Sequence, residues 1–404
     1  MNPNRFIFVI AIWSALTCSS SQSGAAAPQQ QPPAVQADAS FDQLTEAFRN
    51  RYNIELTTSP PASENEDVGF KVISPRDRLP LERLQVIGEE LARYSPSMLR
   101  ATRVKKIALV SKLTRNNVVR PGTHTGFTYY VNVEEQPSEP FERHLFHYSM
   151  ASTVLRRFCG EMTSLEPRWL TLNDPAFRYG GGGKVYRPSS DMNHNDAPRG
   201  FSSLYSRAGA SEDKAEVFAM LMVPDDLRWM KERAARDPIL AAKMKYMQSL
   251  IDYFNNLEES RDQLWVEALF DLALHREPRE MDPKYLDYRD KILKRNGIIN
   301  ERGWAGRTAL LVAVMENQTN LPQEMIRAGA DVRLADEDGF TPLHAAGFMG
   351  NAIVVRVLLE AGADPAAKDR FGGTPLDWAR QRNNKEAIAE LMKLRPKSRN
   401  ANRP

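Results

Sequence analysis

The chain has little cysteine, few histidines and no excess of charge of one sign. Its two cysteines, Cys18 and Cys159, are too few for a disulfide framework or a cysteine-based zinc cluster. The 54 basic residues nearly balance the 51 acidic residues, which excludes a nucleic-acid-binding footprint over the whole chain. We therefore expect no nucleic-acid partner. Any metal or acid–base site must be built from the six histidines and from carboxylates.

The composition is otherwise that of a soluble globular protein. Hydrophobic residues make up 42% of the chain, charged residues 26% and aromatic residues 9%. These values exclude a wholly disordered, collagen-like or polytopic membrane protein. A length of 404 residues allows two or three domains.

The N-terminal 27 residues have the layout of a secretory signal peptide. Arg5 precedes an apolar run of 12 residues, Phe6 to Thr17, which is too short to span a bilayer core of about 30 Å as a helix. Ala25 to Ala27 offers a cleavage site of small residues. We predict an exported protein, periplasmic or secreted, with no transmembrane span in the mature chain. Cys18 leaves open the alternative of a lipoprotein anchored through that residue.

The C-terminal third carries a repeat with a period of 33 residues. Gly306-Arg307-Thr308-Ala309-Leu310 recurs as Gly339-Phe340-Thr341-Pro342-Leu343 and again as Gly372-Gly373-Thr374-Pro375-Leu376. The middle copy continues into His344-Ala345-Ala346, which completes the pattern T-P-L-H-x-A. A period of 33 with this pattern resembles ankyrin repeats, and we expect three of them over residues 300–395. Because three is about the minimum for a stable stack, we expect them to lean on the preceding domain.

An ankyrin stack exposes a concave surface of loops and short helices that binds proteins. We therefore predict a protein partner on the ankyrin face, with a rigid structural cap as the alternative. Residues 396–404 are expected to be a frayed basic tail, and residues 28–40, which are rich in proline, glutamine and alanine, a disordered spacer.

Residues 41–299 are expected to form an α+β domain that is mainly helical, with a small sheet. Patterns of β-branched and aromatic residues predict strands at residues 104–111 and 127–133. Apolar periodicity and composition predict helices at residues 79–94, 141–158, 211–223, 238–255 and 261–274.

Several ordered motifs in this domain are similar to zinc metallopeptidases of the anthrax lethal factor type. Residues 143–148, Arg-His-Leu-Phe-His-Tyr, resemble H-E-L-F-H-Y, and residues 212–216, Glu-Asp-Lys-Ala-Glu, resemble E-D-x-A-E. Residues 169–179 and 200–205 also resemble segments of that family. The resemblance implies a zincin-like fold followed by a short α-solenoid of ankyrin repeats.

The resemblance also implies roles for individual residues. His147 matches the second zinc ligand, Glu212 the third ligand, Glu216 a supporting carboxylate and Tyr205 a tyrosine that stabilises the oxyanion. The first ligand position is Arg143, which cannot bind a metal because its guanidinium stays protonated. The position of the general base is His144. We therefore predict a catalytically inactive domain with no metal cofactor.

Alternatives remain open at this site. In the first alternative, His144, His147 and Glu212 form an atypical zinc site, and the protein is a working metallohydrolase. In another, the inactive cleft still binds an extended peptide. For the inactive domain we predict that Arg143 replaces the lost metal and forms a hydrogen bond with Glu212, since a buried carboxylate without a cation is costly.

Overall fold

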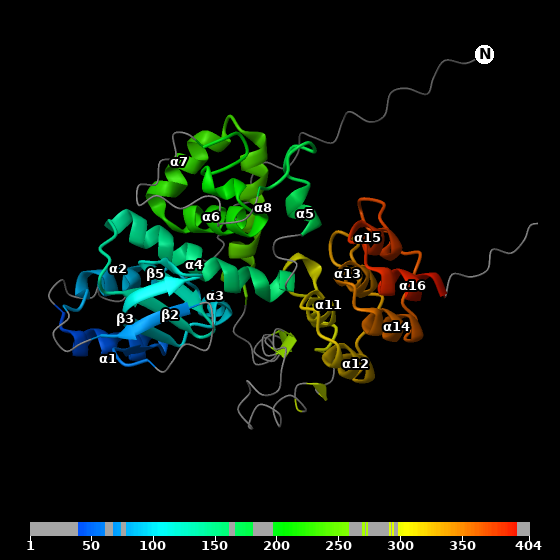
Figure 1. The fold of residues 1–404 in the computed structure, drawn as a ribbon, viewed down its shortest axis with the longest axis horizontal. Coiled ribbons are helices and arrows are strands. Elements are labelled where there is room, and N and C mark those ends of the chain that lie inside the picture. The colour runs from blue at the N-terminus through cyan, green and yellow to red at the C-terminus, as the bar shows by residue number, and fades with distance from the viewer. Residues whose placement is uncertain are drawn as a thin grey trace, which may run out of the picture. The chain divides into compact units, whose positions relative to one another are not determined.

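A small mixed sheet, a set of helices packed against it and three C-terminal helix pairs make up the described part of the chain in a computed structural model (Figure 1). The structure describes residues 39–60, 68–73, 78–160, 166–180, 197–257, 269–270, 272–273, 291, 293–294 and 298–393. We call the described residues from 39 to 294 the body and those from 298 to 393 the repeat module. The predicted signal peptide, nearly all of the spacer, the basic tail and most of the helix expected at 261–274 lie outside the described residues.

Strand β3 (Lys106–Arg115) is the centre of the sheet. It pairs in parallel with β1 (Glu55–Thr57) and β6 (Thr128–Asn132), and antiparallel with β2 (Val68–Val72) and β4 (Val118–Val119). Strand β5 (Gly122–Thr125) closes the path β1-β3-β6-β5 by pairing antiparallel with β6. The two strands expected from the sequence are β3 and β6, and both predictions are confirmed.

One face of the sheet carries the main core of the body. Ile107 and Tyr129, which are register partners on β3 and β6, point to the same side as Phe146 on helix α4, and the rings of Tyr129 and Phe146 meet edge to face at 5.3 Å. The helices of the body that are described over their whole length are α1 (Phe41–Tyr52), α2 (Leu81–Leu91), α3 (Pro96–Thr102), α4 (Glu139–Cys159), α5 (Pro167–Leu170), α6 (Ala210–Met222), α7 (Pro224–Ala234) and α8 (Pro238–Asn255), with a short 3-10 turn η3 (Tyr205–Arg207). Helix α4 is the longest of these, and it packs against both α2 and α6.

The repeat module consists of three helix pairs joined by the turns that we call fingers, residues 302–308, 335–341 and 368–374. The pairs are α11 (Ala309–Met315) with α12 (Asn320–Arg327), α13 (Pro342–Met349) with α14 (Ala352–Glu360), and α15 (Pro375–Gln381) with α16 (Lys385–Lys393). The first helices α11, α13 and α15 pack on one another in order, and so do the second helices α12, α14 and α16. A threonine begins each first helix, because the hydroxyls of Thr308, Thr341 and Thr374 each accept a hydrogen bond from a backbone N–H one turn further on. The repeat expected from the period of 33 is confirmed.

The first repeat is adapted to dock on the body. Its position 303 is glycine where the later fingers carry Asp336 and Asp369, and a Cβ there would lie 2.8 Å from atoms of the Phe158 and Phe270 rings. Gly160 ends helix α4 with φ +51°, and a Cβ on it would lie 2.7 Å from the backbone of Met315 on α11. The two backbones therefore approach as closely as glycine allows.

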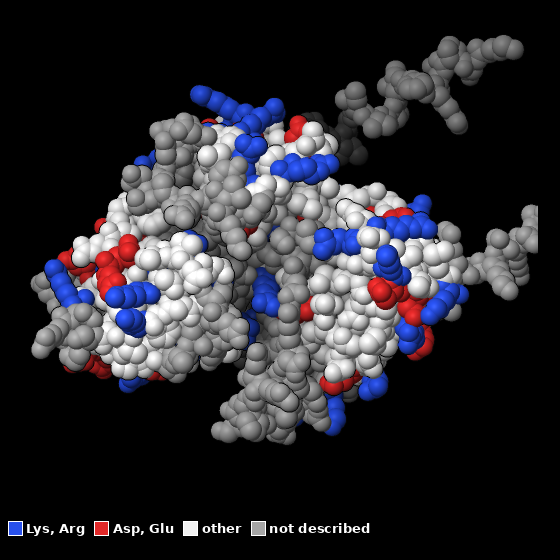
Figure 2. Space-filling view, viewed as in Figure 1, with Lys and Arg blue, Asp and Glu red and all other residues white. Residues whose placement is uncertain are grey.

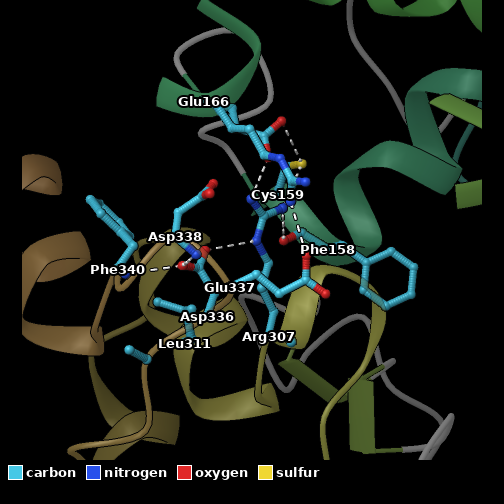
Figure 3. Close-up of polar contacts among 12 residues, drawn as sticks. Phe158, Cys159, Glu166, Arg307, Leu311, Asp336, Glu337, Asp338 and Phe340 are labelled. Atoms are coloured by element: carbon cyan, nitrogen blue, oxygen red, sulfur yellow. Dashed lines mark hydrogen bonds and ion pairs between the residues drawn. The ribbon is translucent and has the colours of Figure 1, made fainter. Parts of the chain in front are cut away.

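A buried ion-pair cluster joins the body to the first finger (Figure 3). Arg307 of that finger donates to Glu166, to the Phe158 carbonyl oxygen at 2.8 Å and to Cys159 Sγ at 3.1 Å. Glu166 also accepts hydrogen bonds from Lys214 Nζ on α6 at 2.6 Å and from the Tyr246 hydroxyl on α8 at 2.5 Å.

The charges in this cluster compensate each other. Burial alone would raise the pKa of Glu166, but the Lys214 and Arg307 cations outweigh it and hold that pKa well below its usual range. The body and the repeat module form one compact unit, and the expectation that the repeats lean on the preceding domain is confirmed. Of the helices in the described residues, not one has the length and apolar character needed to cross a membrane.

Replacing Glu166 with Gln should destabilise the protein by about 3–5 kcal/mol, because it removes the charged carboxylate that the buried cations of Arg307 and Lys214 share. The free energy of unfolding, measured by denaturant titration, tests this. The matched control is Glu337→Gln. Glu337 contacts Arg168 at 3.0 Å but its side chain is 58% exposed, so its loss should cost less than about 1 kcal/mol. Equal costs for the two substitutions would contradict the assignment.

Candidate functional site

Helix α4 presents the residues of the degenerate motif to two different neighbours. Arg143 and His147 lie one turn apart and face α2, whereas His144 and Tyr148 lie one turn apart and face α6, α7 and η3. Because successive residues of a helix are rotated by about 100°, residues 143 and 144 cannot point to the same place. The motif is thus divided between two polar clusters.

The first cluster is centred on Glu90 of α2, which is completely buried. His147 Nε2 lies 2.7 Å from Glu90 Oε2, and His147 Nδ1 lies 2.8 Å from the Tyr94 hydroxyl oxygen. Arg143 donates to the other oxygen of Glu90, and also to Glu89 at 2.6 Å and to Glu139 at 2.6 Å. Burial alone would raise the pKa of Glu90, but the hydrogen bond from His147 and then the charges and hydrogen bonds of its other partners lower it.

The predicted hydrogen bond between Arg143 and Glu212 is wrong. Arg143 is held by carboxylates of α2 and of its own helix, and Glu212 accepts a hydrogen bond from the Ser211 hydroxyl at 2.7 Å. A buried carboxylate near residue 143 does have Arg143 as its cation, as the physical argument requires. This carboxylate is Glu90, which the sequence resemblance does not single out.

The second cluster surrounds His144. Its Nδ1 lies 3.1 Å from Asp226 Oδ2 on α7, and its Nε2 lies 3.5 Å from Glu216 Oε1 on α6. The hydroxyl oxygens of Tyr148 and Tyr205 are 3.1 Å apart beside these acids. Burial alone would lower the pKa of His144, but the Glu216 carboxylate, followed by Asp226, raises it to about 9. His144 is therefore an imidazolium at neutral pH that binds three helices together.

The structure does not gather His144, His147 and Glu212 at one point. His144 and His147 have separate partners on different helices, and within the described ranges no three histidine, cysteine, aspartate or glutamate side chains are arranged to hold a metal ion. Glu216 lies beside His144, and Tyr205 contacts Tyr148 one turn further along α4, whereas Arg143 and His147 contact Glu90.

Sequence reasoning missed the acidic partners Glu90, Asp226 and Glu166. One signal was present for Glu90, which lies between Ile87 and Leu91 on the apolar stripe of α2, where a carboxylate must be paired when buried. No comparable signal marks Glu166, whose cationic partners Lys214 and Arg307 are 48 and 141 residues away in the sequence.

The second candidate site is the side of the last two repeats that carries Phe371 and Trp378, which we call the open side. Trp378 of α15 packs edge to face on Phe340 at 5.6 Å and on Phe348 at 5.8 Å, and its indole N–H donates to Asp369 at 2.6 Å. Phe371, at the tip of the third finger, is 42% exposed. Lys and Arg side chains, with acidic ones among them, gather over this part of the chain (Figure 2).

Comparisons with known proteins cover the repeat module. A family model described as ankyrin repeats (3 copies) matches residues 287–369 and 310–403. The C-terminal repeats are ankyrin repeats. Such repeats indicate protein partners.

Three relatives show how far the likeness extends. Protein phosphatase 1 regulatory subunit 12A of Mus musculus is 43% identical over 56 residues, which are 14% of this chain and 5% of that protein. Notch-regulated ankyrin repeat-containing protein of Homo sapiens is 38% identical over 61 residues, 15% of this chain and 54% of that protein. Notch-regulated ankyrin repeat-containing protein B of Danio rerio is 38% identical over 61 residues, 15% of this chain and 55% of that protein. The chain thus spans from a twentieth to about half of the length of these relatives.

The raised pKa of His144 predicts a pH-dependent stability. The folded protein binds this proton more tightly than the unfolded chain, so the contribution is complete below pH 6.5 and is lost as the pH rises to about 9. The free energy of unfolding of the wild type, minus that of His144→Gln, should fall by about 3 kcal/mol between pH 6.5 and 9.5.

Burial also lowers the pKa of His124 to about 3, which costs stability below pH 6.5, but the wild type and His144→Gln share this contribution and it cancels in their difference. Glu216→Gln should move the fall to lower pH, since it removes the largest charge that raises the pKa of His144. A difference that stays constant across this pH range would contradict the charged state of His144.

Proposed function

We propose that the protein is an exported, protein-binding scaffold in which a catalytically inactive, metallopeptidase-like body supports three ankyrin repeats. The proposal rests on a difference in exposure between the first and the third finger. The first finger is buried against the body through Arg307, whereas the third finger exposes Phe371 and Arg370. Repeats two and three are thus available to a partner, in a position that the body fixes.

The composition of the open side supports binding rather than a purely structural cap. Phe371, Trp378 and Arg370 are aromatic and arginine side chains, the residue types that dominate the binding energy of protein interfaces. A cap would need polar residues there instead, such as the exposed Lys385 and Glu386 in the first turn of α16.

The polar clusters of α4 support the inactive body. Residue 143 is an arginine paired with three carboxylates, and His144 is charged between two more. Both residues thus take part in charge pairs that stabilise the helix packing. The alternative of a zinc hydrolase that uses His144, His147 and Glu212 would require the two imidazole rings to leave separate partners and turn toward α6 together.

Export is the remaining part of the proposal, and it rests on the N-terminal 27 residues. Cleavage after the alanines would release a soluble protein, whereas lipid attachment at Cys18 would anchor it to a membrane. The mass of the N-terminal peptide of the mature protein separates these two outcomes.

A photo-crosslinking amino acid in place of Phe371 should capture a protein partner in the native cell. Benzoylphenylalanine preserves the exposed ring and reacts only with atoms that touch it. The matched control is the same residue in place of Ile353, which is 52% exposed on the second helix of the middle repeat. We expect a discrete crosslinked protein from position 371 and none, or a different one, from position 353. Identical products from both positions, or none from 371, would count against the proposal.

The purified protein should contain no stoichiometric zinc and cleave no peptide. Elemental analysis after equilibration with zinc and removal of the free metal measures the first, and a mixed peptide substrate library the second. About one zinc per chain that disappears in His147→Ala would refute the inactive assignment and favour the metallohydrolase.

A further inference from the structure

The last repeat carries a positively charged aromatic surface. We call it the terminal face and define it by Lys368, Arg370, Phe371, Trp378 and Arg382. Its three cations are exposed, and the exposed Asp377 is paired with Arg380 at 3.9 Å on another side of α15. The remaining acid of this segment, Asp369, is buried and used internally, since it accepts hydrogen bonds from the backbone of Phe371 and Gly373 and from the indole of Trp378.

The neighbouring acidic finger does not cancel this charge. The second finger contains Asp336, Glu337 and Asp338, but each of them already has a cation. Asp336 lies 3.4 Å from Arg307, Glu337 lies 3.0 Å from Arg168, and Asp338 lies 2.6 Å from Arg370. Arg370 remains 55% exposed in spite of this pair. With Arg370 counted against Asp338 and Arg380 against Asp377, Lys368 and Arg382 leave the terminal face positive.

Aromatic rings lie between these cations. Arg370 is 5.5 Å from the centre of the Phe371 ring, and Arg382 is 5.1 Å from the centre of the Phe348 ring at the end of α13. Such contacts hold the guanidinium groups against apolar surface, where a carboxylate that pairs with them is partly shielded from water. The terminal face thus offers apolar contact and carboxylate binding together.

The chain itself provides an example of this kind of recognition. The body docks on the first finger by presenting a carboxylate, Glu166, to Arg307, next to the rings of Phe158 and Trp304. This intramolecular contact shows that a finger arginine beside aromatic residues can be the anchor of an interface in this module.

From this we infer that the terminal face binds an acidic protein segment that carries apolar side chains next to its carboxylates. The inference rests on the proposed protein-binding function and adds the chemistry of the partner and the residues that read it. Nucleic acid is the other polyanion that such a surface attracts. The arginines of the fingers already bind carboxylates within this chain, Arg370 with Asp338 and Arg307 with Glu166, which favours a carboxylate ligand.

Selection of random 12-residue peptides displayed on phage against the full-length chain tests the inference. We expect the selected peptides to be enriched in Asp and Glu beside Leu, Phe or Trp. A selected peptide labelled with fluorescein then gives the affinity by fluorescence polarisation. Phe371→Ser should weaken it at least tenfold and Arg382→Gln at least fivefold, with a further loss as salt rises.

The matched control for the charge is Arg356→Gln. Arg356 is 53% exposed on α14, in the other layer of helices, so its loss should change the affinity less than twofold. The melting temperature of each variant confirms that it folds.

The outcomes separate the inference from the proposed function. Peptides that bind without acidic enrichment, or that are equally sensitive to Arg356→Gln, overturn the inference and leave the protein-binding function standing. A 20-nucleotide single-stranded oligonucleotide that displaces the peptide and binds more tightly overturns it in favour of nucleic acid. If no peptide is enriched over the uncoated surface, the proposed function fails and the inference fails with it.

Discussion

A single buried carboxylate, Glu166, receives contacts from three parts of the protein. Lys214 on α6, Tyr246 on α8 and Arg307 in the first finger all donate hydrogen bonds to it. Taking these charges out of water is costly, and the arrangement is stable because each charge has partners of the opposite sign at hydrogen-bond distance. The position of the repeats on the body depends on this cluster more than on any exposed contact.

Docking at Glu166 changes what the ankyrin repeats can do. A stack of three repeats is near the lower limit of stability, and its first repeat here packs on the body with Gly160 and Gly303 at the closest points. The body therefore stabilises the stack and at the same time covers part of its surface. What stays open is the last finger with Phe371, so the partner is expected at the end of the stack that is furthest along the chain.

The sequence predicted the repeat module well because its constraints are local. The turn residues, the capping threonines and the glycine at each finger recur every 33 residues, and each acts within a few positions of itself. The strands β3 and β6 were also predictable, since buried parallel strands are runs of β-branched and aromatic residues.

The site on α4 was predicted less well, for a geometric reason. Residues 143–148 lie on a helix, as predicted, and their polar side chains form buried contacts. The resemblance does not tell which neighbouring helix each of these side chains faces. Arg143 faces α2 and contacts Glu90. The next residue, His144, is turned by about 100° around the helix axis and faces α6, the helix that carries Glu212. Partners such as Glu90 and Asp226, which lie 53 and 82 residues from Arg143 and His144, come together only in the folded chain.

The most direct test of this account is native-state hydrogen exchange on two helices that meet at the junction. If the cluster around Glu166 makes the body and the repeats one cooperative unit, amides in the last turns of α4 and in α11 should exchange with the same free energy of opening. That free energy should fall for both helices together in Glu166→Gln. Amides of α11 that open at a free energy about 2 kcal/mol or more below those of α4, and that do not respond to this substitution, would show that the repeats are an independent module.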